Sequence, residues 1–128
     1  MNEHRFFVCK KCGNLAGLIH ASGVPMFCCG EPMAELIPNS TDASKEKHIP
    51  LVTQVGPALV KVSVGALQHP MEEAHHIAWV YLQTKEGGQR KRLLNGAPAE
   101  VNFTLIGDEP IAVYAYCNLH GLWMKKLK

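Results

Sequence analysis

The five cysteines and seven histidines of this 128-residue chain are its side chains best suited to chemistry. Four of the cysteines form two close pairs, Cys9 and Cys12 in "CKKC" and Cys28 and Cys29 in "CC". A C-x-x-C turn directs two thiolates at one ion, and a second pair completes a tetrahedral site of four sulfurs. Zinc and a single iron both suit such a site, and two disulfides are the alternative. The odd number of cysteines argues against a fully paired disulfide framework.

The fifth cysteine, Cys117, lies three residues before His120 in "YAYCNLHGLW". Three further histidines, His48, His69 and His75, stand in "EKHIP" and "HPMEEAHH". Each histidine alone would be interpreted as structural, but imidazoles together with one soft thiolate suit iron or copper. A thiol–imidazole pair of Cys117 and His120 for acyl transfer is the alternative. That alternative leaves the other three histidines unexplained, so the set indicates a second metal site.

Short segments with strand character must position these side chains. In "ALVKVSV", Val60, Val62 and Val64 share one face, which is the period of a half-buried strand. Turn signals such as "KEGGQ", "NGAP" and "GDEP" separate similar segments, which are "IPLVTQ", "HIAWVYLQT", "RKRLL", "AEVNFTLI", "IAVYAYC" and "GLWMKKL". About seven short strands predict a mostly β fold, an antiparallel sandwich of immunoglobulin-like type. A sandwich of this kind could gather all the candidate histidines at one rim.

The composition changes near residue 38 and predicts two domains. Residues 1–37 hold four cysteines and little periodicity, and "PNSTDASKEK" at 38–47 is polar and punctuated like a linker. Residues 48–128 hold the predicted sandwich. A fragment of 37 residues is too short to build a proper core, so its cysteines are expected to hold a stabilising metal.

Composition and charge exclude several classes of protein. Apolar residues make up 47% and charged residues 19% of the chain, which are globular values. No apolar run is long enough to span a membrane, and the first residues show no signal core. A cytoplasmic, thiol-reducing location is therefore expected, where clustered cysteines favour metal over disulfides. The net charge of +2 is too small to indicate a nucleic-acid surface.

Taken together, these motifs resemble the desulfoferrodoxin family, the two-iron form of superoxide reductase. "CKKCG" with "CC" resembles its desulforedoxin-like domain, and "EKHIP", "HPMEEAH" and "CNLHGLW" resemble its E-K-H-x-P, H-P-M-x-x-x-H and C-N-x-H-G-x-W motifs. The resemblance covers essentially the whole chain. It implies one iron on Cys9, Cys12, Cys28 and Cys29. It also implies a catalytic iron with one axial thiolate and four equatorial imidazoles, from Cys117, His48, His69, His75 and His120. His76 departs from the tyrosine expected in many relatives and is not counted as a ligand.

The activity that the resemblance implies is the one-electron reduction of superoxide to hydrogen peroxide, without formation of dioxygen. Five protein ligands would leave one position of an octahedral iron open to the anion. The resemblance places Glu46 and Lys47 beside that position. Lys47 would attract superoxide and deliver a proton through water, and Glu46 would occupy the open position after oxidation. A homodimer and a rubredoxin-like electron donor are also implied.

Two other functions stay open at this point. One is a non-catalytic iron protein that transfers electrons, and the other is a zinc-stabilised interaction module in which Cys117 is a buried structural thiol. Around a metal, the imidazoles are expected to donate their second N–H to a carbonyl or carboxylate. The amides of Asn118 and Leu119 are expected to donate to the axial sulfur. Gly121 is expected to let the chain turn so that His120 also reaches the metal.

Overall fold

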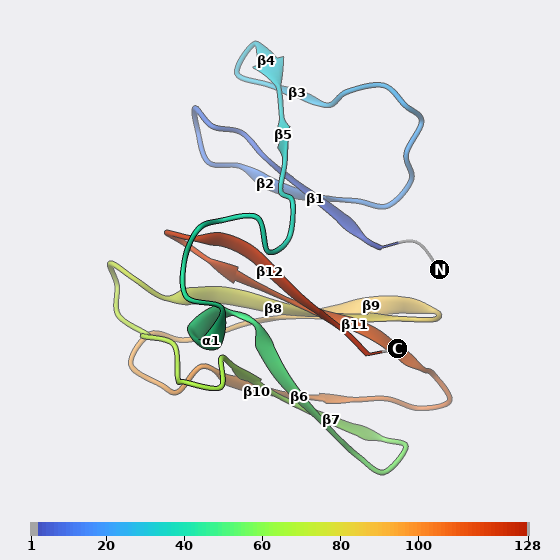
Figure 1. The fold of residues 1–128 in the computed structure, drawn as a ribbon. Helices are drawn as coiled ribbons and strands as arrows, with labels where there is room; N and C mark the ends of the chain where they lie inside the picture. Colours follow the sequence, from blue (N-terminus) through green and yellow to red (C-terminus); the bar gives the residue numbers. More distant parts are fainter. Residues whose placement is uncertain (1–2, 128) are drawn as a thin grey trace. The chain divides into compact units, whose positions relative to one another are not determined.

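The computed structural model describes residues 3–127 and divides the chain into two compact units, one ending at Ile37 and the other beginning at Pro38 (Figure 1). Nearly all regular structure is antiparallel strand, so the predicted mostly β fold is confirmed. Within the described residues, no helix is long and apolar enough to cross a membrane.

The first unit consists of five very short strands. They are β1 (Arg5–Val8), β2 (Leu15–Leu18), β3 (Phe27–Cys28), β4 (Glu31–Pro32) and β5 (Ala34–Glu35). Strand β1 lies between β2 and β5, and β3 pairs with β4. Among residues 3–37 only Phe6 and Cys9 are buried. So small a core leaves the four-cysteine cluster as the main element that can hold this unit together.

The second unit is a sandwich of two antiparallel sheets with one short helix, α1 (Lys45–His48). One sheet has the order β10-β7-β6 and the other the order β12-β11-β8-β9. The strands are β6 (Pro50–Val55), β7 (Leu59–Val64), β8 (Ile77–Thr84), β9 (Gly87–Arg92), β10 (Glu100–Thr104), β11 (Pro110–Cys117) and β12 (Gly121–Lys126). The seven strands match the number predicted. The fourth strand of the larger sheet, β9, joins β8, as the extra strand of variable-type immunoglobulin domains does.

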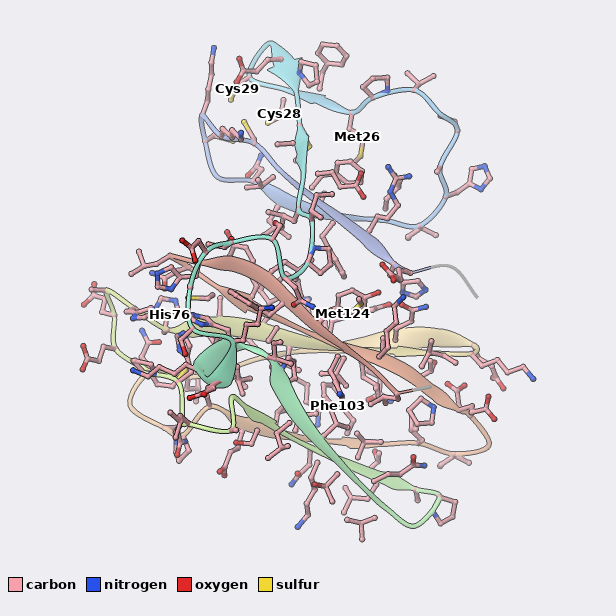
Figure 2. The ribbon with its side chains drawn as sticks, viewed as in Figure 1. Met26, Cys28, Cys29, His76, Phe103 and Met124 are labelled. Atoms are coloured by element: carbon pink, nitrogen blue, oxygen red, sulfur yellow. The ribbon has the colours of Figure 1, made fainter. Side chains whose placement is uncertain are left out.

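Alternating side chains build the core between the two sheets. On β7, Val60, Val62 and Val64 are buried while Lys61 is exposed. Phe103 of β10, labelled in Figure 2, is fully buried in the same cluster as these valines. The cluster continues onto β8 and β11, so both sheets contribute to one hydrophobic core.

The strand register brings the candidate site to one end of the sandwich. Pro50 at the start of β6 pairs with Val64 at the end of β7. Cys117 at the end of β11 pairs with Ile77 at the start of β8 and with Gly121 at the start of β12. Figure 1 shows α1 and the loops before β8 and β12 at this same end. The predicted gathering of site residues at one rim therefore follows from the register.

Residues 38–47 are tied to the sandwich as well as joining the units. The backbone N–H of Asn39 donates to the carbonyl of Leu122, 2.9 Å away. The side chain of Asn39 donates to the carbonyl of Met124 and accepts from its N–H, at 3.1 and 2.9 Å. This stretch is thereby fixed along β12 before α1 begins at Lys45.

Candidate functional site

The four N-terminal cysteines lie together in the structure. The sulfurs of Cys9, Cys12, Cys28 and Cys29 all lie within 4.8 Å of one another. Cys9 directly follows β1, Cys28 is the last residue of β3, and Cys29 begins the turn to β4; Figure 2 labels Cys28 and Cys29. Cys29 adopts a φ of 52°, which lets adjacent cysteines direct both sulfurs to one point. None of the cysteines forms a disulfide, and the four together can hold one metal ion.

Backbone and side-chain N–H groups support these sulfurs. The amide of Cys12 lies 3.5 Å from the sulfur of Cys9, and the amide of Asn14 lies 3.5 Å from the sulfur of Cys12. The side-chain amide of Asn14 also donates to the sulfur of Cys28, at 3.6 Å. The Cys12 amide is the largest of the effects that lower the pKa of Cys9 to about 6. A thiolate is therefore favoured at Cys9, and the role of Asn14 was missed from the sequence.

The second cluster combines imidazoles with the fifth cysteine. Ligand atoms of His48, His69, His75 and Cys117 all lie within 4.8 Å of one another. They come from α1, the turn after β7, the loop before β8 and the last residue of β11. His48, His69 and Cys117 are buried, so these three members of the cluster have little contact with solvent. Residues far apart in the sequence thus converge on one small volume.

Hydrogen bonds fix which nitrogen of each ring faces the cluster. Nδ1 of His48 lies 2.6 Å from the carbonyl of Ser44, and Nδ1 of His69 lies 2.7 Å from the carbonyl of Pro70. A carbonyl only accepts, so both Nδ1 atoms carry the proton and both Nε2 atoms are unprotonated acceptors. The expected imidazole-to-carbonyl bonds are therefore present for these two rings.

Two of the ring nitrogens lack any partner. Within residues 3–127, Nε2 of His69 and Nε2 of His75 are the buried side-chain N or O atoms that have no hydrogen bond. Leaving a buried polar atom unpaired is costly, and a metal ligand is one way to satisfy it. Burial lowers the pKa of His69 to about 4 and also lowers the pKa of His75. Both rings are therefore neutral near pH 7, the state in which imidazole binds metal.

His120 joins this cluster from the turn between β11 and β12. Its Nδ1 lies 3.1 Å from Nε2 of His48 and 3.8 Å from the sulfur of Cys117. The ring thus turns Nδ1 toward the cluster, in contrast to His48 and His69. Gly121 follows with a φ of 78°, the backbone freedom that was expected at this position.

Glu46 and Lys47 are exposed on α1, directly before His48. Burial is the main cause of the lowered pKa of His75, and the positive charge of Lys47 is the last of the smaller contributions to it. Lys47 directly precedes His48, a member of the cluster.

The expected support of the Cys117 sulfur by the amide of Asn118 is wrong. That amide instead donates to the carbonyl of His76, 3.1 Å away. Ring Nδ1 of His76 lies 2.9 Å from the carbonyl of Glu72, so His76 faces its own loop. Figure 2 labels His76 at the end of the sandwich where α1 lies. Apart from the presence of a short polar loop, nothing in the sequence indicates either contact.

The chemistry of both donor sets fits iron. Four sulfurs at one point suit iron or zinc, and imidazoles with one thiolate suit iron or copper better than magnesium or calcium. Iron suits both sets, and it is the metal that the resemblance to desulfoferrodoxins implies. The second cluster would hold it through Cys117 and the unpaired nitrogens of His69 and His75, with His48 and His120 beside them.

Comparison with known proteins places these features in a family. The sequence model described as Desulfoferrodoxin matches residues 40–126. A desulfoferrodoxin from Syntrophotalea carbinolica is 41% identical over 117 residues, which is 91% of each chain. The crystal structure of the superoxide reductase from Treponema pallidum superposes with a TM-score of 0.81 and 39% identity, covering 98% of this chain and all of the other. A superoxide reductase from Giardia intestinalis, titled 1Fe-SOR, has a TM-score of 0.55 and 30% identity, and covers 66% of this chain and 99% of its own.

Proposed function

The chain belongs to the desulfoferrodoxin family, and we propose that it is a superoxide reductase whose reaction takes place at the histidine–cysteine cluster. The relatives and the solved structure named superoxide reductase support this proposal. The site residues proposed are Cys117 with His48, His69, His75 and His120 for the catalytic iron, and Cys9, Cys12, Cys28 and Cys29 for the second iron.

One observation carries the proposal. Two buried imidazole nitrogens, Nε2 of His69 and of His75, have no partner and lie in the same small volume as the sulfur of Cys117. A structural thiol in a hydrophobic core needs no such nitrogens. A zinc-stabilised interaction module would use the four N-terminal cysteines and would leave this second cluster without a purpose.

The reaction balances as one superoxide, one electron and two protons giving one hydrogen peroxide. Bound iron would supply the electron by passing from the ferrous to the ferric state, and an external donor would restore it. The thiolate of Cys117 would donate electron density to a bound iron. Cys117 is buried, and electrostatic effects are strong in such a low-dielectric site. No dioxygen is formed in this stoichiometry.

Lys47 and Glu46 are proposed to serve the open side of the site. The ammonium group of Lys47 attracts the superoxide anion and passes one proton toward it through water. The place of Lys47 on α1, directly before the proposed ligand His48, supports this role. Glu46 is proposed to take the open position once superoxide has reacted, and its exposed place on α1 leaves its carboxylate free to move.

We further propose a rubredoxin-like electron donor, a homodimer and a cytoplasmic location. The exposed cysteines Cys12 and Cys29 make the four-cysteine iron accessible to such a donor. This exposure also favours the second candidate function, a non-catalytic electron carrier that uses both irons.

Metal analysis and single-turnover kinetics test the proposal together. The purified protein should contain two irons per chain, and a colourless protein with only zinc would contradict the two-iron assignment. The reduced protein is then mixed rapidly with one equivalent of superoxide under anaerobic conditions. If the protein is a superoxide reductase, the histidine–cysteine iron should be oxidised rapidly. If it is only an electron carrier, superoxide should not oxidise this iron. A Cys117→Ser variant, which keeps the four-cysteine iron, serves as the control.

A further inference from the structure

The side chain of Asn118 makes two hydrogen bonds on either side of His75. Its Oδ1 accepts from the backbone N–H of His76 at 2.8 Å, and its Nδ2 donates to the carbonyl of Ala74 at 3.0 Å. Ala74 and His76 are the two neighbours of His75 in the chain. One amide side chain therefore forms hydrogen bonds with the backbone immediately before and immediately after a proposed ligand.

The same residue is joined to the cluster through the chain. Asn118 directly follows Cys117, and its own backbone N–H donates to the carbonyl of His76 at 3.1 Å. Three hydrogen bonds thus connect the peptide next to the sulfur with the peptides next to the imidazole. The strand pairing of Cys117 itself is with Ile77, two residues beyond His75.

The loop bonded by Asn118, residues 72–76, also has hydrogen bonds of its own. Glu72 and His75 exchange backbone hydrogen bonds at 3.0 and 3.2 Å, and ring Nδ1 of His76 lies 2.9 Å from the carbonyl of Glu72. These bonds hold the loop together internally. The bonds of Asn118 then connect it to the end of β11.

From these contacts we infer that Asn118 is a positioning residue that locks His75 to Cys117 and so sets the angle between an imidazole ligand and the thiolate ligand. The inference rests on the proposed function, because it takes His75 and Cys117 as ligands of one iron. Asn118 touches neither the metal nor superoxide. Its effect is exerted through the backbone on both sides of His75, as other supporting hydrogen bonds act on metal ligands.

A matched control exists in the same unit. Asn39 also uses its side chain to accept from one backbone N–H and donate to one carbonyl, both of Met124 on β12. Both asparagines are exposed. Removing either side chain therefore deletes the same two kinds of hydrogen bond, but of the two only Asn118 bonds the residues next to a proposed ligand. Asn39→Gly is the suitable variant because its backbone φ of 61° disfavours alanine.

The test is the rate at which the reduced, iron-loaded protein loses iron to an excess of a ferrous chelator, with no superoxide present. The phase lost in Cys117→Ser identifies the histidine–cysteine iron, and the four-cysteine iron contributes equally to every other variant. Asn118→Ala is expected to release the identified iron about 10- to 100-fold faster, and to shift the thiolate-to-iron absorption band. Asn39→Gly is expected to leave both the rate and the band unchanged, although its melting temperature falls similarly.

Equal release from Asn118→Ala and the unchanged protein would overturn the inference. So would faster release from both variants in proportion to their loss of stability. If Asn118→Ala fails to fold, Asn118→Asp carries the test, since it keeps the acceptor for His76 and loses the donor to Ala74; it should release iron at an intermediate rate. Because no superoxide is used, a protein that retains iron through Asn118 but does not reduce superoxide would contradict the proposed function and leave this inference standing.

Discussion

The indole of Trp123 stacks on the imidazole of His48, with ring centroids 4.7 Å apart and an angle of 22° between the planes. Its Nε1–H also donates to the carbonyl of His120 at 3.1 Å. Trp123 is fully buried, so it joins two proposed ligands to the core of the sandwich. One buried side chain thus contacts two proposed ligands.

Substitution of Trp123 should separate stacking from hydrogen bonding. Trp123→Phe keeps an aromatic ring against His48 but loses the bond to the carbonyl of His120, and should lower the free energy of unfolding by about 1 kcal/mol for that bond. The absorption band of the iron site should shift as His120 moves. Trp79→Phe is the control, because Trp79 stacks on Tyr116 instead of a histidine. It should cost stability without shifting the band, and equal spectra for both variants would contradict the role of Trp123.

Gly65 allows α1 to lie where it does. Its φ is 83°, and a Cβ there would meet the carbonyl of Leu67 and lie 2.5 Å from the carbonyl oxygen of Lys47. Gly65→Ala should therefore displace the segment that carries Lys47 and His48. It should lower the free energy of unfolding by more than the backbone cost of a left-handed alanine, which is about 1–2 kcal/mol. Chemical denaturation measures the change.

Gly56→Ala is the matched control for this substitution. Gly56 has a φ of 65°, but a Cβ there would have no heavy atom within 4 Å. Gly56→Ala should lower the free energy of unfolding only by the backbone cost of a left-handed alanine, and the absorption spectrum of the iron should stay unchanged. Similar losses of stability at the two glycines would show that the position of α1 does not depend on Gly65.

Lys47 should influence the rate of reaction with superoxide more than the binding of iron. Lys47→Ala removes a positive charge near the site and should slow the second-order rate by roughly tenfold at low ionic strength. The difference should shrink as salt is added, because salt screens exposed charges. Lys45→Ala on the same helix is the control and should react nearly as the unchanged protein does. An unchanged rate in Lys47→Ala by rapid mixing would rule out the guiding role.

The first unit should depend on its metal to fold. With only Phe6 and Cys9 buried among residues 3–37, removal of one sulfur ligand by Cys12→Ser should melt β1–β5. The sandwich has its own core and should remain folded. Amide hydrogen exchange, read residue by residue, should show fast exchange confined to the first unit. Full protection of β1 in the metal-free variant would contradict this dependence.

The sandwich could be predicted from the sequence because its strands follow simple patterns. The valines of β7 alternate in and out of the core, and each run of β-branched and aromatic residues became a strand. The position of β9 was less accurate: residues 90–94 were expected, but the strand is Gly87–Arg92. The glycines had been assigned to the turn. Gly88 pairs with Gln83 in this strand, and only glycine fits there because a Cβ would collide with the ring and hydroxyl of Tyr81.

Contacts that depend on three-dimensional placement could not be predicted. The strands of the first unit are two to four residues long, too short to show a period. The motif around Cys117 indicated a ligand. The hydrogen bonds from Asn118 to the residues on either side of His75, however, depend on how that loop packs against β11. The supporting role of Asn14 depends likewise on the turn formed by the four-cysteine cluster.

The central claim is tested most directly by counting the products formed from a known amount of superoxide. The iron-loaded protein is kept reduced by an electron donor, and hydrogen peroxide and dioxygen are measured together. Reduction at the histidine–cysteine iron predicts one peroxide for each superoxide consumed and no dioxygen. Dioxygen released at half the superoxide consumed would identify dismutation and contradict the account.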